Sequence, residues 1–556
     1  MTIFRISKIF FFLLMLSHFS MAQLHKREFT SPLNIPLKLS GSFCEVRSDH
    51  FHSGIDIKTN GREGLPVFSV NDGYVYRIKV SATGYGKAIY VMHPGNILSV
   101  YGHLSAFVGA VADSIEALQY RAESYDVEYF PDSTLFRFKR GEQIAWSGNS
   151  GGSEAPHLHF EIRDQLKEEP LNPLLYDWFV EDTISPFIQN VSIYNFNNSR
   201  FKEISTIASS EADTIEVDVD SIAIAIQAVD YSNESNASIG FYSASVTSAS
   251  DTIFQIAFNR MNFDQTRFVN AYIDFTRRLE TGRTFQRLYC LPGNKSNMFR
   301  DSGSGIIALN ANEVREVDIK LNDINGNYSK QTLFFKRNQI NNRKGPTLDL
   351  IYPVKPINKS WKDASIEIPA DAFYQSVDAV SVNRIKRKRN YPVLSITSTE
   401  LAFHKTFLIR FVMKGDKFKG KHTVVMLNEK YEIISAIGGV LKGSMLTANS
   451  RKTGLYSVAI DTVSPVVESY KFENDTVNYR SFLTIKIKDN LTGIESYSCK
   501  VDGKWFLFEN DAKTNRLIAD ARKLPGVFDL ELMLEDKCGN VLLKKMSIKN
   551  PYQSSE

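Results

Sequence analysis

The sequence predicts an all-β protein, and three observations favour this class. Short runs in which apolar and polar residues alternate recur along the chain, for example at 73–80, 483–488 and 528–534. Clusters of Gly, Asn and Asp separate these runs, and only 114–122 has a helical pattern. Alternation with a period of two is typical of strands that bury one face, so we expect antiparallel sheets packed as sandwiches or barrels.

The chain, at 556 residues, is too long for a single hydrophobic core. Its hydrophobic content of 43% and charged content of 23% are ordinary for globular domains, so most of it should be folded. The formal net charge is +4, and Arg5 and Lys8 contribute two of these charges. We find no basic stripe and no zinc-finger spacing, and we therefore expect no nucleic-acid partner.

The first 22 residues have the layout of a secretory signal peptide. Arg5 and Lys8 precede an apolar run at 9–16, and small residues lead up to a cleavage point after Ala22. The apolar run is too short to span the roughly 30 Å of a hydrocarbon core, and no Cys follows the cleavage point. We therefore expect an exported protein, periplasmic or secreted, without a stable membrane anchor.

Two repeated phrases indicate where β-rich units begin and end. The phrases at 182–186 (DTISP) and 461–465 (DTVSP) each introduce a run of expected strands, and proline keeps the residue before it extended. The phrases at 323–327 (DINGN) and 536–540 (DKCGN) come near the ends of such runs, where Gly-Asn suits a hairpin. Unless these phrases are chance turns, they predict two or three Ig-like sandwiches behind an N-terminal domain. The expected units are a signal peptide (1–22), an N-terminal domain (23–181), a sandwich-like unit (182–345), a β-rich unit (346–459) and an Ig-like sandwich (460–556).

The four cysteines are scattered, and only Cys499 and Cys538 share an expected unit. Export would permit a disulfide between these two, and free buried thiols are the alternative.

Histidine is rare, with ten in the chain, yet six lie between residues 50 and 159. His52 and Asp56 stand four residues apart and offer an imidazole and a carboxylate, both normal zinc ligands. His157 and His159 would share one face of a strand, and His103 lies in another expected strand. Each piece alone also fits ordinary turn or exposed strand residues.

Together these segments resemble the lysostaphin-type (LytM-like, M23 family) zinc endopeptidases, over about 38–164. The resemblance implies an antiparallel β-sheet peptidase domain. The appended β-units look like those of exported Bacteroidetes proteins. The matching strings occur in the family's order: Asp49-His50-Phe-His52-Ser-Gly-Ile-Asp56, Gly64-Leu-Pro-Val-Phe68, Asp72-Gly-Tyr-Val75, Gly84-Tyr-Gly86, Tyr101-Gly-His-Leu104, Gly141-Glu-Gln-Ile-Ala145, Ser147-Gly-Asn-Ser-Gly151 and His157-Leu-His-Phe-Glu-Ile162.

The resemblance implies that His52, Asp56 and His159 bind Zn²⁺, while His103 and His157 line the reaction site without binding the metal. Three protein ligands leave a fourth position for water, which is typical of catalytic zinc. His103 or His157 would accept a proton from that water, donate one to the leaving amine, or stabilise the oxyanion; the sequence does not assign these steps. Glu161 either orients an imidazole from the same strand face or is exposed.

The resemblance also implies peptidoglycan as the substrate, because relatives cleave D-Ala-to-diamino-acid cross-links or glycine bridges of bacterial walls. In a Gram-negative wall the D-Ala–diaminopimelate cross-link is the expected target. Two alternatives stay open. The chain could be a non-catalytic activator of wall amidases, as are relatives that have lost their zinc ligands. It could also be an envelope scaffold whose C-terminal β-units bind protein partners.

The segment 107–139 departs from the family pattern, because it is longer than most relatives need. We expect an elaborated loop with a helical turn, which could roof the cleft, select substrate or receive a partner. If the enzyme is autoinhibited, the cover should be this insertion or a C-terminal unit. Cys44 also stands where Gly is common, but it replaces no expected ligand or catalytic residue.

Overall fold

The computed structural model consists mostly of β-strands, which confirms the predicted all-β class. The expected signal peptide at 1–22 lies outside the described residues. Within them, no helix has both the length and the apolar character needed to cross a membrane. The structure describes residues 29–176, 180–197, 200–209, 214–233, 235, 237–311, 313–338, 356–375, 380–385, 391–398, 402–413, 418, 420–475 and 480–553.

The N-terminal unit is built on a nine-stranded antiparallel sheet with the main order β1-β2-β11-β6-β5-β4-β8. β12 pairs with β11 and β9 pairs with β4 at its margins. Two flanking strands, β2 and β6, enclose β11, so three strands that carry candidate site residues lie side by side. The strands are β1 (Leu39–Gly41), β2 (Ile55–Lys58), β4 (Gly73–Val80), β5 (Lys87–His93), β6 (Ile97–Leu104), β8 (Val127–Tyr129), β9 (Arg137–Phe138), β11 (His157–Asp164) and β12 (Glu169–Leu171).

A second, three-stranded sheet shares its core with the first. It consists of β3 (Pro66–Phe68), β10 (Gln143–Trp146) and β7 (Ala106–Phe107). Val67 and Ile144 from this sheet pack with Leu158 and Phe160 from β11, and all four side chains are fully buried. Leu158 and Phe160 alternate with His157 and His159, so the core holds one face of β11 and leaves the histidines on the other.

The segment 107–139 is more ordered than a loop with a helical turn. It contains α2 (Gly109–Ala122), which includes the helix predicted at 114–122, and the short strands β8 and β9 on the edge of the main sheet. Val111, Ile115 and Gln119 are buried at a spacing of four, so a single helical face packs on the unit.

The described strands that follow form three pairs of sheets, each pair around its own core. The boundaries expected at 182, 346 and 460 stay a prediction. The second unit pairs the sheet β14-β13-β16-β17, to which β20 and β21 add, with the sheet β15-β23-β22-β18-β19. Its elements are β13 (Phe187–Asn197), β14 (Arg200–Ala208), β15 (Thr214–Val217), β16 (Ser221–Tyr231), β17 (Ser238–Ile239), β18 (Ser243–Ser248), β19 (Asp251–Ala257), η2 (Phe263–Phe268), α3 (Val269–Tyr272), α4 (Phe275–Thr281), β20 (Gln286–Arg287), β21 (Ile307–Ala308), β22 (Val314–Asn322) and β23 (Tyr328–Arg337).

The third and fourth units are also two-sheet assemblies. In the fourth unit Cys499 and Cys538 are free thiols, so the possible disulfide between them is not formed. The third unit contains β24 (Ile357–Ser360), β25 (Ala364–Ile368), β26 (Val380–Ile385), β27 (Val393–Ser398), β28 (Phe407–Val412), β29 (His422–Leu427), β30 (Ile433–Gly438), β31 (Val440–Lys442), β32 (Met445–Ser450) and β33 (Gly454–Ile460). The fourth contains β34 (Val466–Asp475), β35 (Arg480–Lys488), β36 (Ile494–Val501), β37 (Lys504–Trp505), β38 (Glu509–Asp511), β39 (Arg516–Asp520), β40 (Val527–Asp536) and β41 (Val541–Lys549).

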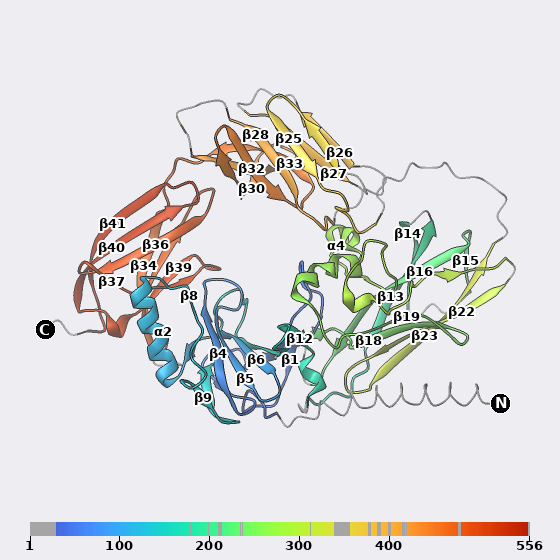
Figure 1. Ribbon diagram of the computed structural model, residues 1–556, viewed down its shortest axis with the longest axis horizontal. Helices are drawn as coiled ribbons and strands as arrows, with labels where there is room; N and C mark the ends of the chain where they lie inside the picture. Colours follow the sequence, from blue (N-terminus) through green and yellow to red (C-terminus); the bar gives the residue numbers. More distant parts are fainter. Residues whose placement is uncertain are drawn as a thin grey trace.

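The units follow one another around an arc, and the fourth returns to the first (Figure 1). Its contact with the N-terminal unit runs along α2. The indole ring of Trp505 meets the ring of Tyr120 edge-on at a centroid distance of 5.1 Å, and Lys523 pairs with Glu116 at 2.6 Å. The insertion therefore contacts another part of the same chain.

The loop that precedes β2 is anchored in the second unit. Phe43, Cys44 and Phe51 are buried and belong to the hydrophobic core of the second unit's sheets rather than to the core beneath β11. The ring of Phe51 lies 5.8 Å from that of Tyr272, and the backbone N–H of Phe51 donates to the Thr266 hydroxyl at 2.9 Å. Because His52 follows Phe51 directly, the second unit helps to position a candidate ligand.

We predict that Phe51→Ala lowers the free energy of unfolding by about 3–5 kcal/mol, because it leaves a cavity in a packed core. Denaturant unfolding measures this change. Leu543→Ala is the control, since Leu543 is 77% exposed and its truncation should change the value by less than about 0.5 kcal/mol. Equal effects of the two substitutions would contradict the assignment of Phe51 to the core.

Candidate metal centre

The register of β2 on β11 brings the predicted metal ligands together. Asp56 lies directly opposite His159, and His157 lies two residues along on the same face. His52 precedes β2 and is held by backbone hydrogen bonds with Cys44 and Glu45. One ligand atom from each of the three predicted ligands lies within 4.8 Å of the others. All three residues are buried, with exposed fractions of 3% to 6%.

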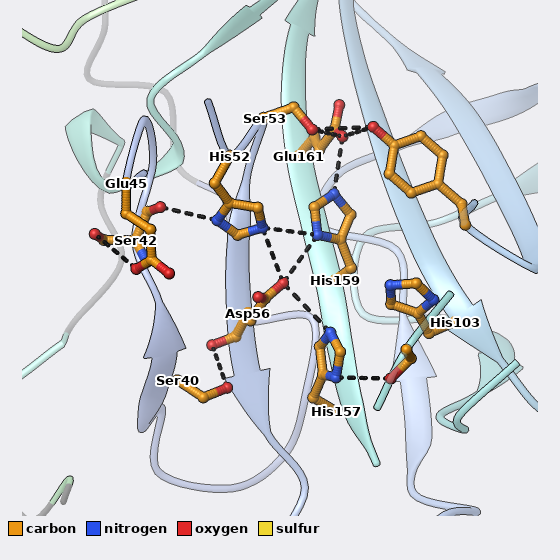
Figure 2. Close-up of polar contacts among 12 residues, drawn as sticks. Ser40, Ser42, Glu45, His52, Ser53, Asp56, His103, His157, His159 and Glu161 are labelled. Carbon is orange, nitrogen blue, oxygen red and sulfur yellow. Dashed lines mark hydrogen bonds and ion pairs between the residues drawn. The ribbon is translucent and has the colours of Figure 1, made fainter. Parts of the chain in front are cut away.

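The atoms that face one another are His52 Nε2, His159 Nδ1 and Asp56 Oδ1 (Figure 2). The carboxylate oxygen is 3.1 Å from His52 Nε2 and 2.9 Å from His159 Nδ1, and the two nitrogens are 3.2 Å apart. The outer nitrogens have other partners: His52 Nδ1 donates to the Ser42 carbonyl at 2.8 Å, and His159 Nε2 donates to Glu161 at 2.8 Å. Because these partners only accept, each outer nitrogen keeps its proton and each inner nitrogen can offer a lone pair to a metal.

Glu161 is fully buried and orients His159, so the exposed alternative for this residue is wrong. Besides His159, its Oε1 accepts hydrogen bonds from Ser53 at 2.6 Å and Tyr85 at 2.5 Å, and its Oε2 accepts one from Arg163 Nε at 2.6 Å. Burial alone would raise the pKa of the Glu161 carboxyl, but Arg163 and His159 hold that pKa below its ordinary value. Glu161 is therefore a buried anion with a buried cation on either side.

Sequence reasoning missed Arg163, Tyr85 and Ser53. Arg163 could have been found, since it continues the alternation of His157, His159 and Glu161 along the same face of β11. Tyr85 lies on a separate loop before β5, and its ring stacks on His159 at a centroid distance of 5.0 Å. Local sequence carries no signal for that contact.

Asp56 forms an ion pair with Arg47. Arg47 Nη2 lies 2.5 Å from Asp56 Oδ2, and Glu45 lies 3.2 Å from the same guanidinium. Gly41 makes the room, because a Cβ atom there would come within 2.7 Å of Asp56 Oδ2 and even closer to Arg47. Burial alone would raise the pKa of Asp56, yet the three neighbouring histidines hold it well below its ordinary value. Asp56 is thus a carboxylate at neutral pH.

The pKa of His159 is raised to about 9 although burial opposes this, because Asp56 and Glu161 lie against its two nitrogens. A positive charge between these carboxylates is therefore favourable. A proton on Nδ1 supplies that charge in the metal-free chain, and a bound metal cation would displace it.

His103 and His157, the predicted catalytic residues, lie beside this cluster. Their rings are 4.8 Å apart, and the His103 ring is 5.8 Å from that of His159. His103 Nδ1 donates to the Ser150 carbonyl at 2.8 Å, which leaves Nε2 as the acceptor. Burial and the neighbouring His159 and His157 charges lower the pKa of His103 to about 3, so its imidazole is neutral.

His103 also has an unusual backbone conformation. Its φ of 58° lies in the left-handed region, which non-glycine residues seldom adopt. The strain is supported by a hydrogen bond from the His103 N–H to the Tyr85 carbonyl, at an irregularity in the pairing of β5 with β6. Such outliers cluster at functional sites, where surrounding structure maintains them.

We predict that Arg163→Met lowers the free energy of unfolding by about 3–5 kcal/mol, because Glu161 is left buried without its cation. The lowered pKa of Glu161 adds a pH signature. The ionised Glu161 stabilises the folded state at pH values above 4.5, the ordinary pKa of this carboxyl. This stabilisation is lost as the pH falls toward the lower pKa that Glu161 has in the folded protein. The difference in free energy of unfolding between wild type and Arg163→Met, measured by denaturant titration, should therefore shrink below pH 4.5.

Arg522→Met is the matched control. Its guanidinium pairs with Asp520 at a surface where the arginine side chain is 56% exposed, and such pairs contribute less than about 1 kcal/mol. A loss for Arg163→Met no larger than this control would contradict the buried ion pair.

Comparison with known proteins adds the family. Residues 50–125 match the model of Peptidase family M23; this range includes His52, Asp56 and His103 and ends before β11. The chain is similar to the DD-carboxypeptidase/endopeptidase Mpg of Neisseria meningitidis, with 31% identity over 123 residues. That match covers 22% of this chain and 22% of Mpg.

A second relative is the lipoprotein NlpD of Yersinia enterocolitica, 28% identical over 116 residues, with 21% of this chain and 93% of that protein covered. Among solved structures, the catalytic domain of the M23 protein EnpA from Enterococcus faecalis matches with 22% identity and a TM-score of 0.20, covering 27% of this chain and 95% of that one. The chain spans only 20% to 25% of the length of the metalloprotease relatives it matches.

The family predicted from the motifs is thereby confirmed: this chain carries a peptidase family M23 domain, in a family of zinc metallopeptidases.

Proposed function

We propose that this protein is an exported zinc metalloendopeptidase that hydrolyses the peptide cross-links of bacterial peptidoglycan. One observation carries the proposal: two imidazoles and a carboxylate direct their free donor atoms at a common point, while their outer nitrogens are already occupied. Two nitrogens and one oxygen are an ordinary protein donor set for Zn²⁺, and three protein ligands leave room for water and substrate. The residues present therefore fit the metal that the family implies.

Zinc bound by His52, Asp56 and His159 would supply a Lewis acid and lower the pKa of a bound water to about 7. The neighbouring His103 and His157 would transfer the protons of the reaction. The neutral His103, whose Nδ1 donates to the Ser150 carbonyl, would accept a proton at Nε2 from the attacking water and donate it to the leaving amine. His157 Nδ1 donates to the Ala155 carbonyl at 2.8 Å, so His157 is oriented beside His103 for the same task or for stabilising the oxyanion.

Two features support peptidoglycan as the substrate: the similar relatives and the signal-peptide-like start of the chain. The similar Mpg is named as a DD-carboxypeptidase/endopeptidase. The signal-peptide-like start of the chain is consistent with a substrate in the envelope. We propose the D-Ala–diaminopimelate cross-link as the bond cleaved.

The fourth unit contacts the loop between β10 and β11, which carries Ser150. Lys513 Nζ donates to the Ser153 carbonyl at 2.8 Å and to the Asn149 carbonyl, and Lys87 pairs with Glu509 at 2.6 Å. Between the two units lies a cavity of about 460 Å³, with Ser150 in its wall. The Ser150 carbonyl also accepts the hydrogen bond from His103, and we propose that substrate parts remote from the scissile bond bind in this cavity.

Digestion of purified peptidoglycan, followed by mass spectrometry of the released fragments, tests this function. Wild type should release peptides cut at the cross-link, whereas His159→Ala and chelator-treated enzyme should release none above background. His50→Ala is the matched control, because His50 is exposed and its ring contacts only Asp49 among the described hydrogen-bond partners. No release by wild type would favour the non-catalytic alternative, and equal release by His159→Ala would refute the proposed site.

The buried Glu161 gives a second prediction. Glu161→Gln keeps the shape of the side chain but removes the charge that supports the His159 proton, so zinc affinity should fall by about 10–100-fold. Competition with a chromogenic chelator measures this affinity. Glu128→Gln, at an exposed glutamate on β8 that pairs with Arg77, should bind zinc as wild type does. Unchanged affinity in Glu161→Gln would show that Glu161 does not support the ligand.

A further inference from the structure

The repeated phrases found in the sequence have no part in the proposed peptidase site. The phrases at 182–186 and 323–327 lie together in the second unit, and those at 461–465 and 536–540 lie together in the fourth. Asp182 and Asp461 each stand shortly before the first strand of their unit, β13 and β34. Asn327 in the turn after β22 donates to the Asp182 carbonyl at 3.0 Å, and Asn540 in the turn after β40 donates to the Asp461 carbonyl at 3.1 Å. The same contact therefore closes the same corner of both units.

Each corner contains three carboxylates. Asp323 and Asp536 begin the turns, and their Oδ1 atoms accept backbone hydrogen bonds within them. The third carboxylate comes from the strand that pairs with the first strand: Asp230 in β16, and Asp489 directly after β35. In each triad, one carboxylate oxygen per residue lies within 4.8 Å of the others.

Two members of each triad are buried, and Asp182 and Asp489 are half-buried. Asp230, Asp461 and Asp536 are each only 1% exposed. Three like charges at this distance in a protein interior repel one another strongly without a cation. Lys421, which reaches the second corner, donates to the Cys538 carbonyl at 2.9 Å.

Unpaired oxygen atoms point to a ligand at both corners. Ser232 is only 2% exposed, and its buried hydroxyl has no hydrogen-bond partner among the described residues. Ser232 lines a cavity of about 30 Å³ together with Asp182, Asp230 and Asp323. At the other corner, Asp489 Oδ2 accepts from the backbone of Leu491 and Gly493, while the buried Oδ1 has no described partner.

We propose that each triad, Asp182–Asp230–Asp323 and Asp461–Asp489–Asp536, binds one Ca²⁺ ion. The donors are oxygens alone, which suits a hard cation rather than zinc. Ca²⁺–oxygen bonds of about 2.3–2.6 Å let one ion touch oxygens that lie up to roughly 4.8 Å apart. Such an ion would tie the segment that leads into each unit to the turn on its far side.

Equilibrium dialysis against CaCl₂ tests this inference on the full-length, zinc-loaded protein. Concentrations up to about 5 mM are needed, because extracellular calcium modules bind the ion weakly. Wild type should bind two Ca²⁺ ions and unfold at a higher temperature with CaCl₂ than in chelator-free buffer without added calcium. Asp230→Asn and Asp489→Asn should each bind one ion, and the double variant should bind none and lose the thermal shift. His159→Ala should still bind two, which separates these sites from the zinc site.

Asp251→Asn, at an exposed aspartate in β19 outside either triad, is the matched control and should bind two ions. Circular dichroism in calcium-free buffer shows whether the triad variants are folded. The inference is overturned if wild type binds no Ca²⁺, if the triad variants keep two ions while folded, or if equimolar Mg²⁺ displaces the bound ions.

Discussion

The pairing of β2 with β11 is the constraint on which the site depends. It places Asp56 opposite His159, although 103 residues separate them in the chain. Side chains alternate along a strand, so a slip by one residue would turn His159 into the core and Leu158 into the site. Leu158 and Phe160, both fully buried, oppose that slip. On the other side of β11, Gly102 of β6 lies directly opposite His159.

A line of alternating charge is built on this register. Arg47, Asp56, His159, Glu161 and Arg163 each contact the next. Isolated buried charges are costly, and here each carboxylate has a cation on both sides. The ligands are therefore oriented by hydrogen bonds that exist without the metal, which reduces what must be reorganised when a metal binds.

The rest of the chain takes part in this positioning. Phe51, the residue directly before His52, is anchored in the core of the second unit, while Lys513 of the fourth unit contacts the loop that carries Ser150. The proposed calcium triads would act at the segments that lead into those two units. The second and fourth units thus contact the N-terminal unit through defined residues close to the site, and they are not independent domains on a flexible string.

Local sequence determined the features that depend on local periodicity. These are the all-β class, the helix around 114–122, and the shared face of His157 and His159, since strand and helix spacing decide them within a few residues. The motif order also identified the family. Tertiary structure alone decided that Glu161 is a buried anion, that Arg47 and Tyr85 reach the ligands, and that Asp230 and Asp489 complete their triads. These contacts join segments far apart in the chain, and their burial depends on how whole sheets pack, which no local pattern records.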